Sequence, residues 1–161
     1  MESKINGFGT YRWADGREFT GEWINSKIGG FGLHTWPDGR RYEGFFVRDK
    51  RQGYGIYMMP DHNTYSGSWY QGKQHGFGCI FTKEGHLKYG LWQHGQKILK
   101  VTTDQASQIQ DGNLDVRKLV TESKLRDPEQ YWADVKLLTN KFEPFGIFPR
   151  EQASFELKKK K

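Results

Sequence analysis

The feature that most constrains this chain is a recurrence with a step of 23 residues. An aromatic-x-Gly-x-aromatic motif stands at residues 19–23, 42–46 and 65–69, and in weaker form at 88–92. A Gly-aromatic-Gly motif keeps the same step, at residues 7–9, 30–32, 53–55 and 76–78. An acidic-Gly pair follows at residues 15–16, 38–39 and 84–85, with Asp61-His62 at the remaining position. Three motifs that share one register indicate a series of small repeated units.

Each unit is predicted to be a β-hairpin. The aromatic, glycine and aromatic residues of the first motif stand at alternate positions, so all three lie on one face of a strand. Glycine in the acidic-Gly pair supplies the positive φ that tight turns need. Asp61-His62-Asn63 lacks that glycine, so we expect a looser turn there. Glycine also leaves room for a large ring on the adjoining strand, which predicts ladders of Trp, Tyr and Phe.

The composition agrees with a thin sheet. Hydrophobic residues make up only 35% of the 161 residues, whereas aromatic residues reach 16% and there are 20 glycines. A helical bundle would contain more Leu and Ala and far less Gly. We therefore expect a mainly β fold: an elongated, antiparallel, single-layer sheet of stacked hairpins, followed by a short α-helical C-terminal segment.

The combined pattern resembles the MORN (membrane occupation and recognition nexus) repeat. The resemblance covers about residues 4–98, with full repeats at 19–41, 42–64 and 65–87 and partial repeats at 4–18 and 88–98. Lys88 replaces the leading aromatic of the last unit, which predicts a frayed or capping last strand. MORN repeats in other proteins form slightly curved antiparallel sheets, for example in junctophilins and in radial-spoke head proteins. The resemblance implies a scaffold or adaptor, often cytoskeletal or close to membranes.

Residues 99–161 lack the repeat and are predicted to form a linker plus a helical C-terminal segment with a basic tail. Residues 103–113 are expected to be a linker or a weak helix, and 113–125 a short amphipathic helix. A better helix begins with Asp127 as N-cap and Pro128 at its first position, and should end near Asn140. Residues 142–149 are apolar and broken by proline. We expect them to dock on the chain's own sheet or on a partner.

Aromatic side chains are the candidate partner-binding residues. A one-layer sheet cannot bury both of its faces by itself, and ring-rich patches dominate the energetics of interfaces. The candidates are Trp13, Trp23, Trp36, Tyr42, Tyr65, Trp69, Trp92, Trp132, Phe142, Phe145 and Phe148. The truncated first unit also leaves an open strand edge near Gly7 to Trp13, which invites strand addition.

The sequence gives no support for an enzymatic or a metal-binding function. The single cysteine, Cys79, and five dispersed histidines predict no structural metal site. No glycine motif opens a helix after a strand or continues into the Lys-Ser/Thr of a phosphate loop. The net charge of +6 is too small to indicate nucleic-acid binding. We expect no catalytic residues and no cofactor.

A non-catalytic protein–protein interaction scaffold is therefore the leading hypothesis. The resemblance implies a cytoskeletal or ciliary (axonemal) assembly. Partners would bind through the aromatic sheet face, the sheet edge or the C-terminal segment, and a homodimer or larger complex is compatible with this. Two alternatives stay open: a peripheral membrane adaptor that binds anionic phospholipids, and the targeting module of a larger enzyme. The N-terminus lacks the apolar core of a signal peptide, which predicts a cytoplasmic protein.

Overall fold

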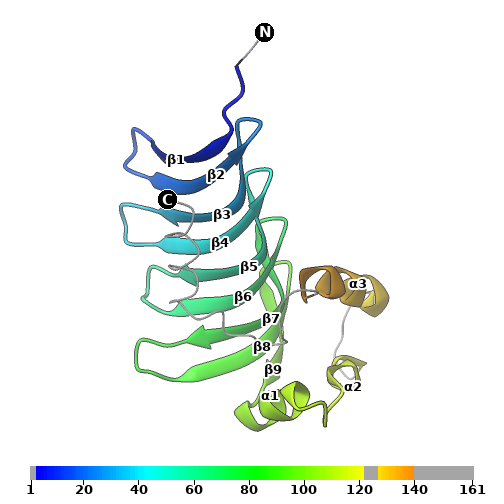
Figure 1. Ribbon diagram of the computed structural model, residues 1–161. Coiled ribbons are helices and arrows are strands. Elements are labelled where there is room, and N and C mark those ends of the chain that lie inside the picture. The colour runs from blue at the N-terminus through cyan, green and yellow to red at the C-terminus, as the bar shows by residue number, and fades with distance from the viewer. Residues whose placement is uncertain (1–2, 122–126, 140–161) are drawn as a thin grey trace.

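The computed structural model describes residues 3–121 and 127–139. Within them, a single antiparallel sheet of nine strands has the same order in space as along the chain (Figure 1). The strands are β1 (Gly7–Arg12), β2 (Glu18–Ile24), β3 (Lys27–Thr35), β4 (Arg41–Val47), β5 (Lys50–Met58), β6 (Thr64–Tyr70), β7 (Lys73–Phe81), β8 (Leu87–Gln93) and β9 (Gln96–Val101). The helices are α1 (Thr103–Gln110), α2 (Val116–Thr121) and α3 (Pro128–Thr139). The predicted fold class, an open sheet of consecutive hairpins with a short helical segment, is confirmed.

A row of paired glycines runs across the sheet. One glycine of each strand from β1 to β8 stands opposite the glycine of the next strand. This glycine row comprises Gly9, Gly21, Gly32, Gly44, Gly55, Gly67, Gly78 and Gly90. The register shifts by a β-bulge just after Gly21, Gly44 and Gly67. Bulges bend strands, and the strands of this sheet curve visibly (Figure 1).

Two-residue turns close the hairpins at one end of the strands. In the turn between β2 and β3, Asn25 and Ser26 have φ of 50° and 65°, and in the next such turn Arg48 and Asp49 have φ of 48° and 68°. Two successive positive φ values define the type I′ turn, whose twist matches that of the flanking strands. The turns therefore support the pairing register that the glycine row requires.

The turn at Asp61-His62-Asn63 is not looser than its counterparts, so that expectation was wrong. The His62 N–H donates to the Met59 carbonyl at 2.9 Å, and the Met59 N–H donates to the Asn63 carbonyl at 2.8 Å. The turns that contain the acidic-Gly pair make the same two bonds. His62 replaces glycine by adopting φ of 67°, a left-handed conformation in which histidine is enriched over most other residues.

The strand that contains Lys88 is neither frayed nor last, which corrects a second expectation. β8 pairs with β7 on one side and with β9 on the other. β9 carries none of the repeat motifs, so the sequence pattern did not indicate it, and it continues to Val101. A capping box then starts α1, in the segment for which a linker was the alternative. The Thr102 hydroxyl accepts from the Gln105 N–H at 3.1 Å, and the Gln105 amide oxygen accepts from the Thr102 N–H at 2.9 Å.

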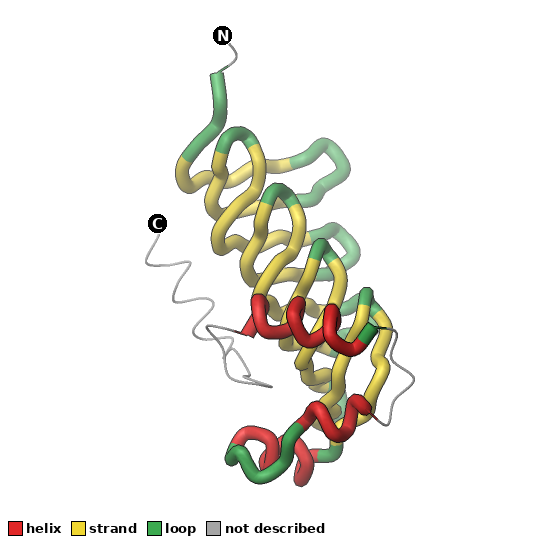
Figure 2. The backbone as a smooth tube through the Cα atoms, turned by 90° about the vertical axis from the view of Figure 1, so that its right-hand side faces the viewer, coloured by secondary structure: helices red, strands yellow, loops and turns green. Residues whose placement is uncertain are grey.

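The helices lie against one face of the sheet, over β5 to β8, and the opposite face is called the aromatic face below. Figure 2 shows α3 lying across the strands. The cluster under the helices joins buried sheet residues to buried helix residues: Phe77, Leu91 and Val101 with Ala106, Ile109, Val120, Tyr131 and Val135. Asp127 caps α3 as predicted, because its Oδ1 accepts from the Gln130 N–H at 3.2 Å. None of the described helices is both long enough and apolar enough to cross a bilayer.

A buried histidine joins the sheet to α3. His75 in β7 is 1% exposed, and its Nδ1 accepts from the backbone N–H of His94 at 3.2 Å. The neutral ring therefore carries its proton on Nε2, which lies 3.8 Å from Asp134 Oδ2 on α3. Burial, and then His94, lower the pKa of His75 to about 4, against the opposing effect of Asp134. His75 is thus neutral at pH 7, and its contact with Asp134 is not an ion pair.

Acidification should destabilise the fold as the pH falls from 6.5 towards 4. The unfolded chain binds a proton at His75 with the ordinary pKa, whereas the folded chain resists it until about pH 4, so protonation favours unfolding. Stability is full above pH 6.5 and falls below it. Urea midpoints across this range measure the effect, and His75→Gln should show a shallower fall. His86→Gln is the control, because His86 is exposed, and it should keep the fall of the wild-type chain. If the urea midpoint of His75→Gln fell with pH as steeply as that of the wild-type chain, this account would be contradicted.

Candidate protein-binding face

Seven rings form a continuous layer on the aromatic face. In order across the sheet, this aromatic layer comprises Trp23, Phe19, Phe46, Tyr42, Trp69, Tyr65 and Trp92. Successive rings meet edge to face at centroid distances of 5.0–5.5 Å and interplanar angles of 76–90°. Such pairs contribute about 0.5–1.5 kcal/mol each beyond the burial of their area. The aromatic layer therefore links the strands from β2 to β8 into one core.

Three rings of this layer are completely buried because they lie on the glycine row. Phe19, Tyr42 and Tyr65 are each 0% exposed. They lie over Gly32, Gly55 and Gly78, respectively. A Cβ atom at Gly78 would stand 2.5 Å from a ring carbon of Tyr65, a distance that packed side chains do not tolerate. The motif spacing thus positions each ring over a backbone that has no side chain.

The buried hydroxyl groups of the layer bind backbone carbonyls. The Tyr42 hydroxyl donates to the Phe45 carbonyl at 3.0 Å, and the Tyr65 hydroxyl donates to the Ser68 carbonyl at 2.9 Å. Burial raises the pKa of both tyrosines, so both remain protonated donors. These bonds satisfy polar atoms that would otherwise be costly to bury.

The aromatic candidates divide into buried and accessible residues. Tyr42 and Tyr65 are 0% exposed, and Trp69 and Trp92 are 3% exposed. The chain itself packs these four rings, so they contribute to the base of the face and offer little area to a partner. Trp13, Trp23 and Trp36 are only partly buried. Trp132 packs in the cluster under the helices. Phe142, Phe145 and Phe148 lie outside the described residues.

A stack of three rings forms the accessible rim of the aromatic face. His34 lies between Trp13 and Trp36, at centroid distances of 5.4 Å and 4.0 Å. The interplanar angles are 24° and 18°, so the three rings are nearly parallel. We call this group the tryptophan stack. It joins the packed aromatic layer at Phe19, whose ring centroid lies 6.2 Å from that of His34.

An arginine lies against each tryptophan of the stack. The Cζ of Arg17 is 4.8 Å from the Trp13 ring centroid, and the Cζ of Arg40 is 4.9 Å from that of Trp36. Each Nε also donates to an aspartate carboxylate at 2.8 Å, Arg17 to Asp15 and Arg40 to Asp38. The backbone N–H of each arginine holds the pKa of its aspartate below the usual value.

Arg17 and Arg40 were not among the candidate partner-binding residues. The sequence Trp-x-Asp-Gly-Arg stands at both 13–17 and 36–40. It was a signal that could have identified them, because the turn brings its first and last residues together.

Arg51 on β5 is a further residue that was not among the candidate partner-binding residues. Its Cζ lies 4.6 Å from the Trp69 ring centroid, 5.4 Å from Tyr57 and 5.7 Å from Tyr42. The side chain is half-buried, and burial lowers its pKa. Arg51 thus places a positive charge between the aromatic layer and the tryptophan stack.

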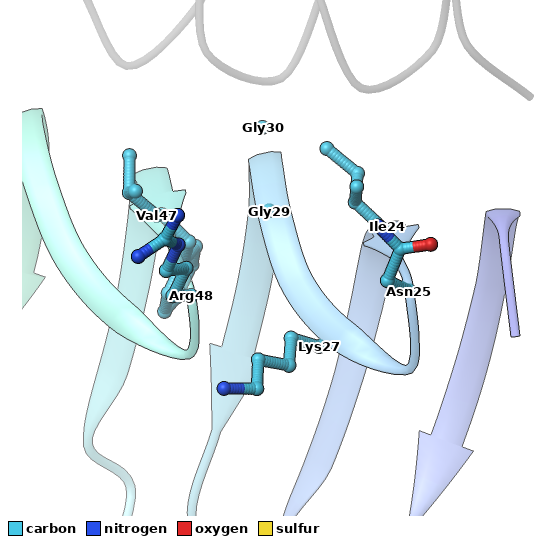
Figure 3. Close-up of a pocket in the computed structure, with 8 residues that line it drawn as sticks. Ile24, Asn25, Lys27, Gly29, Gly30, Val47 and Arg48 are labelled. Atoms are coloured by element: carbon cyan, nitrogen blue, oxygen red, sulfur yellow. The ribbon is translucent and has the colours of Figure 1, made fainter. Parts of the chain in front are cut away.

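A shallow hollow lies at the type I′ turns between β2 and β5. It measures about 550 Å³ and is lined by Ile24, Lys27, Val47 and Arg48 among others (Figure 3). Ile24 and Val47 are 52% and 54% exposed. This hollow is a small apolar patch with basic side chains at its border.

Potential metal-ligating and nucleophilic side chains do not gather on this face. In residues 3–121 and 127–139, no three His, Cys, Asp or Glu side chains are placed to hold a metal ion. Cys79 is buried, and burial raises the pKa of its thiol to about 11. A thiol with that pKa is a poor nucleophile at neutral pH. The tryptophan stack and the arginines beside it favour a role for this face in binding a partner.

Adding a methyl group under a ring should destabilise the protein. Gly78→Ala places its Cβ against Tyr65, and overpacking of this kind costs about 1–3 kcal/mol. Gly9→Ala is the matched control, because Gly9 has the same place in the glycine row and nothing within 4 Å of its added Cβ. Thermal unfolding followed by near-UV circular dichroism should show a clear loss only in Gly78→Ala. Equal losses in the two variants would contradict the ring-over-glycine packing.

Comparison with known proteins identifies the repeat. The family model described as MORN repeat matches four successive stretches, residues 2–16, 19–40, 42–64 and 65–83. Each stretch includes one or two strands of the sheet. The comparison with curated proteins gave no match.

Proposed function

We propose, from the premise that this chain belongs to the MORN-repeat family, that it is a non-catalytic scaffold whose aromatic face binds a protein partner. MORN repeats are generally modules for interaction with proteins or membranes. A cytoskeletal or axonemal assembly is the setting that we propose, on the family resemblance alone.

The tryptophan stack is the observation that carries this proposal. Trp and Arg are enriched among the residues that dominate binding energy at interfaces, and here both types meet on one rim. The two stack interactions of His34 and the aspartate contacts of Arg17 and Arg40 hold the rim in place. A rim that is already ordered loses little conformational entropy when it binds, which favours affinity.

The charge pattern favours a protein over an anionic membrane as the ligand of this rim. Asp15 and Asp38 each engage an arginine of the rim, so the rim as a whole has little net charge. Binding to anionic lipid depends on an excess of positive charge near the surface. Aromatic rings flanked by paired charges suit a folded or extended polypeptide better.

Removal of the stack should abolish partner capture. Crosslinking and affinity purification from the cell of origin would compare the wild-type chain with Trp13→Ala/Trp36→Ala. Truncating a dominant Trp costs at least about 2 kcal/mol, or about thirtyfold in affinity. Leu87→Ala is the control, because Leu87 is 42% exposed and lies outside the rim. Circular dichroism verifies that each variant is folded.

Two outcomes would contradict the proposal. One is undiminished capture by the double variant. The other is salt-sensitive sedimentation with phosphatidylserine vesicles, but not with phosphatidylcholine vesicles, together with no protein whose capture depends on the stack. That second result would support the membrane adaptor instead.

A further inference from the structure

We infer that Arg51 is the centre of a carboxylate-binding site on the aromatic face, and that the protein partner places an Asp or Glu side chain there. This inference deepens the proposed function and rests on it. It names the chemistry that the partner must carry.

The guanidinium of Arg51 is surrounded by rings. Trp69, Tyr57 and Tyr42 lie within 4.6–5.7 Å of its Cζ. Rings stabilise a cation through their electron-rich faces, which explains how Arg51 is tolerated in a half-buried position. They provide no anion, however, and a partly desolvated cation attracts one more strongly than a fully hydrated cation does.

Arg51 differs from Arg17 and Arg40 because no carboxylate of the described residues contacts its guanidinium. Arg17 and Arg40 each donate to an aspartate at 2.8 Å. Among the described residues, no hydrogen bond or ion pair reaches the guanidinium of Arg51. No described group thus occupies its donors, and the fork of a guanidinium matches a carboxylate with two parallel hydrogen bonds.

The position of Arg51 is not a constant feature of the repeat. The same place in the other hairpins, opposite the second aromatic of the motif, holds Ile28, Gln74 or, in the last hairpin, Lys97. Ile28 and Gln74 carry no charge, whereas the Nζ of Lys97 lies 5.4 Å from the Trp92 ring centroid. The hairpins that contain Ile28 and Gln74 form without a cation at this place. Folding of the hairpin therefore does not require Arg51, which favours a role in recognition.

Arg51 lies in one region of the face with Arg17 and Arg40. Burial, and then the positive charges of Arg17, Arg51 and Arg40, lower the pKa of His34 to about 4, against the opposing effect of Asp15. His34 is consequently neutral at pH 7 and the three guanidiniums share one region of the face. Asp15 and Asp38 already engage Arg17 and Arg40. Of these three arginines, Arg51 is the one that no carboxylate of the described residues contacts, so an incoming carboxylate would meet it there.

The surroundings favour a carboxylate of a polypeptide over a phosphate of a lipid surface. Arg51 is recessed between large rings, and Trp36 lies 6.3 Å from Tyr57 at the border of the same region. A side chain can reach into such a site while apolar neighbours along its chain contact the rings. The flat surface of a membrane would first meet the exposed basic residues at the turns, such as Lys27 and Arg48.

A pair of matched peptides tests this site. The probes are a terminally blocked peptide of alternating Glu and Phe and the same peptide with Gln in place of Glu. The Arg51 Nε–H resonance, observed by NMR, reports contact. The Glu peptide should shift this resonance and bind at least about tenfold more tightly than the Gln peptide, as expected for a charge-assisted pair.

Variants at Arg51 should remove this preference. Arg51→Met keeps an unbranched chain without charge, and we expect it to bind the two peptides equally. Arg51→Lys keeps the charge but loses the forked donor geometry of the guanidinium, and should retain only part of the preference for the Glu peptide. If Arg51→Met folds poorly, Arg51→Lys tests the site in its place. Arg12→Met is the control, because Arg12 is exposed on the edge strand and pairs with Glu18. It should leave the preference unchanged.

Several results would overturn the inference. These are equal binding of the two peptides to the wild-type chain, no shift of the Arg51 resonance with the Glu peptide, or a preference that survives in Arg51→Met. Competition by inorganic phosphate, or Arg51-dependent binding of phosphatidylserine vesicles, would assign the site to phosphate instead. Partner capture that fails in Trp13→Ala/Trp36→Ala but persists in Arg51→Met would retain the proposed function and reject only this inference.

Discussion

The contact between an aromatic ring and the bare backbone of the next strand is the interaction on which this structure depends. Phe19, Tyr42 and Tyr65 are fully buried on a single-layer sheet only because glycine lies beneath each of them. A slip of one residue in pairing would move these rings to the opposite face. The glycine row therefore fixes the register and supplies the core at the same time, which suits a chain with so few aliphatic residues.

Because the rings over the glycine row form a core by themselves, the two faces of the sheet have different roles. On one face, α1 and α3 cover Phe77 and Leu91 with their own buried residues. On the other, the aromatic layer buries itself, and the tryptophan stack and its arginines remain at the surface. Binding at a rim that rests on a packed layer differs from binding along an open ladder of rings. The partner meets a preformed surface and does not need to complete the core.

The sequence predicted the features that depend on local periodicity. The step of 23 residues and the alternation within each motif located the hairpins and the glycines, because strand geometry has a period of two. It did not predict β9, which carries no motif, or the tight turn at His62, whose backbone adopts an unusual φ. It predicted ladders of rings over glycine, but not which of them, such as Tyr42 and Trp69, would be almost completely buried, since strand curvature brings together rings from different units.

Residues that act through juxtaposition in space were the least predictable. His75 and Asp134 are far apart in the sequence, and nothing local indicates that α3 brings them together. Arg51 looked like one basic residue among many near a turn. Only the structure shows that its side chain lies against Trp69, while the similar Arg48 is exposed. The part of the site that could be predicted is its chemical class, aromatic and basic, rather than its members.

Native-state amide hydrogen exchange of the free chain tests the central claim most directly. If rings over glycines join the hairpins into one self-sufficient core, the amides of β4, β5 and β6 should exchange slowly and with a common free energy, without any partner. The amides of β1, whose Gly9 has no ring above it, should exchange faster. Exchange of β4 to β6 as rapid as that of β1 would contradict the account, because the aromatic layer would then not hold the sheet together by itself.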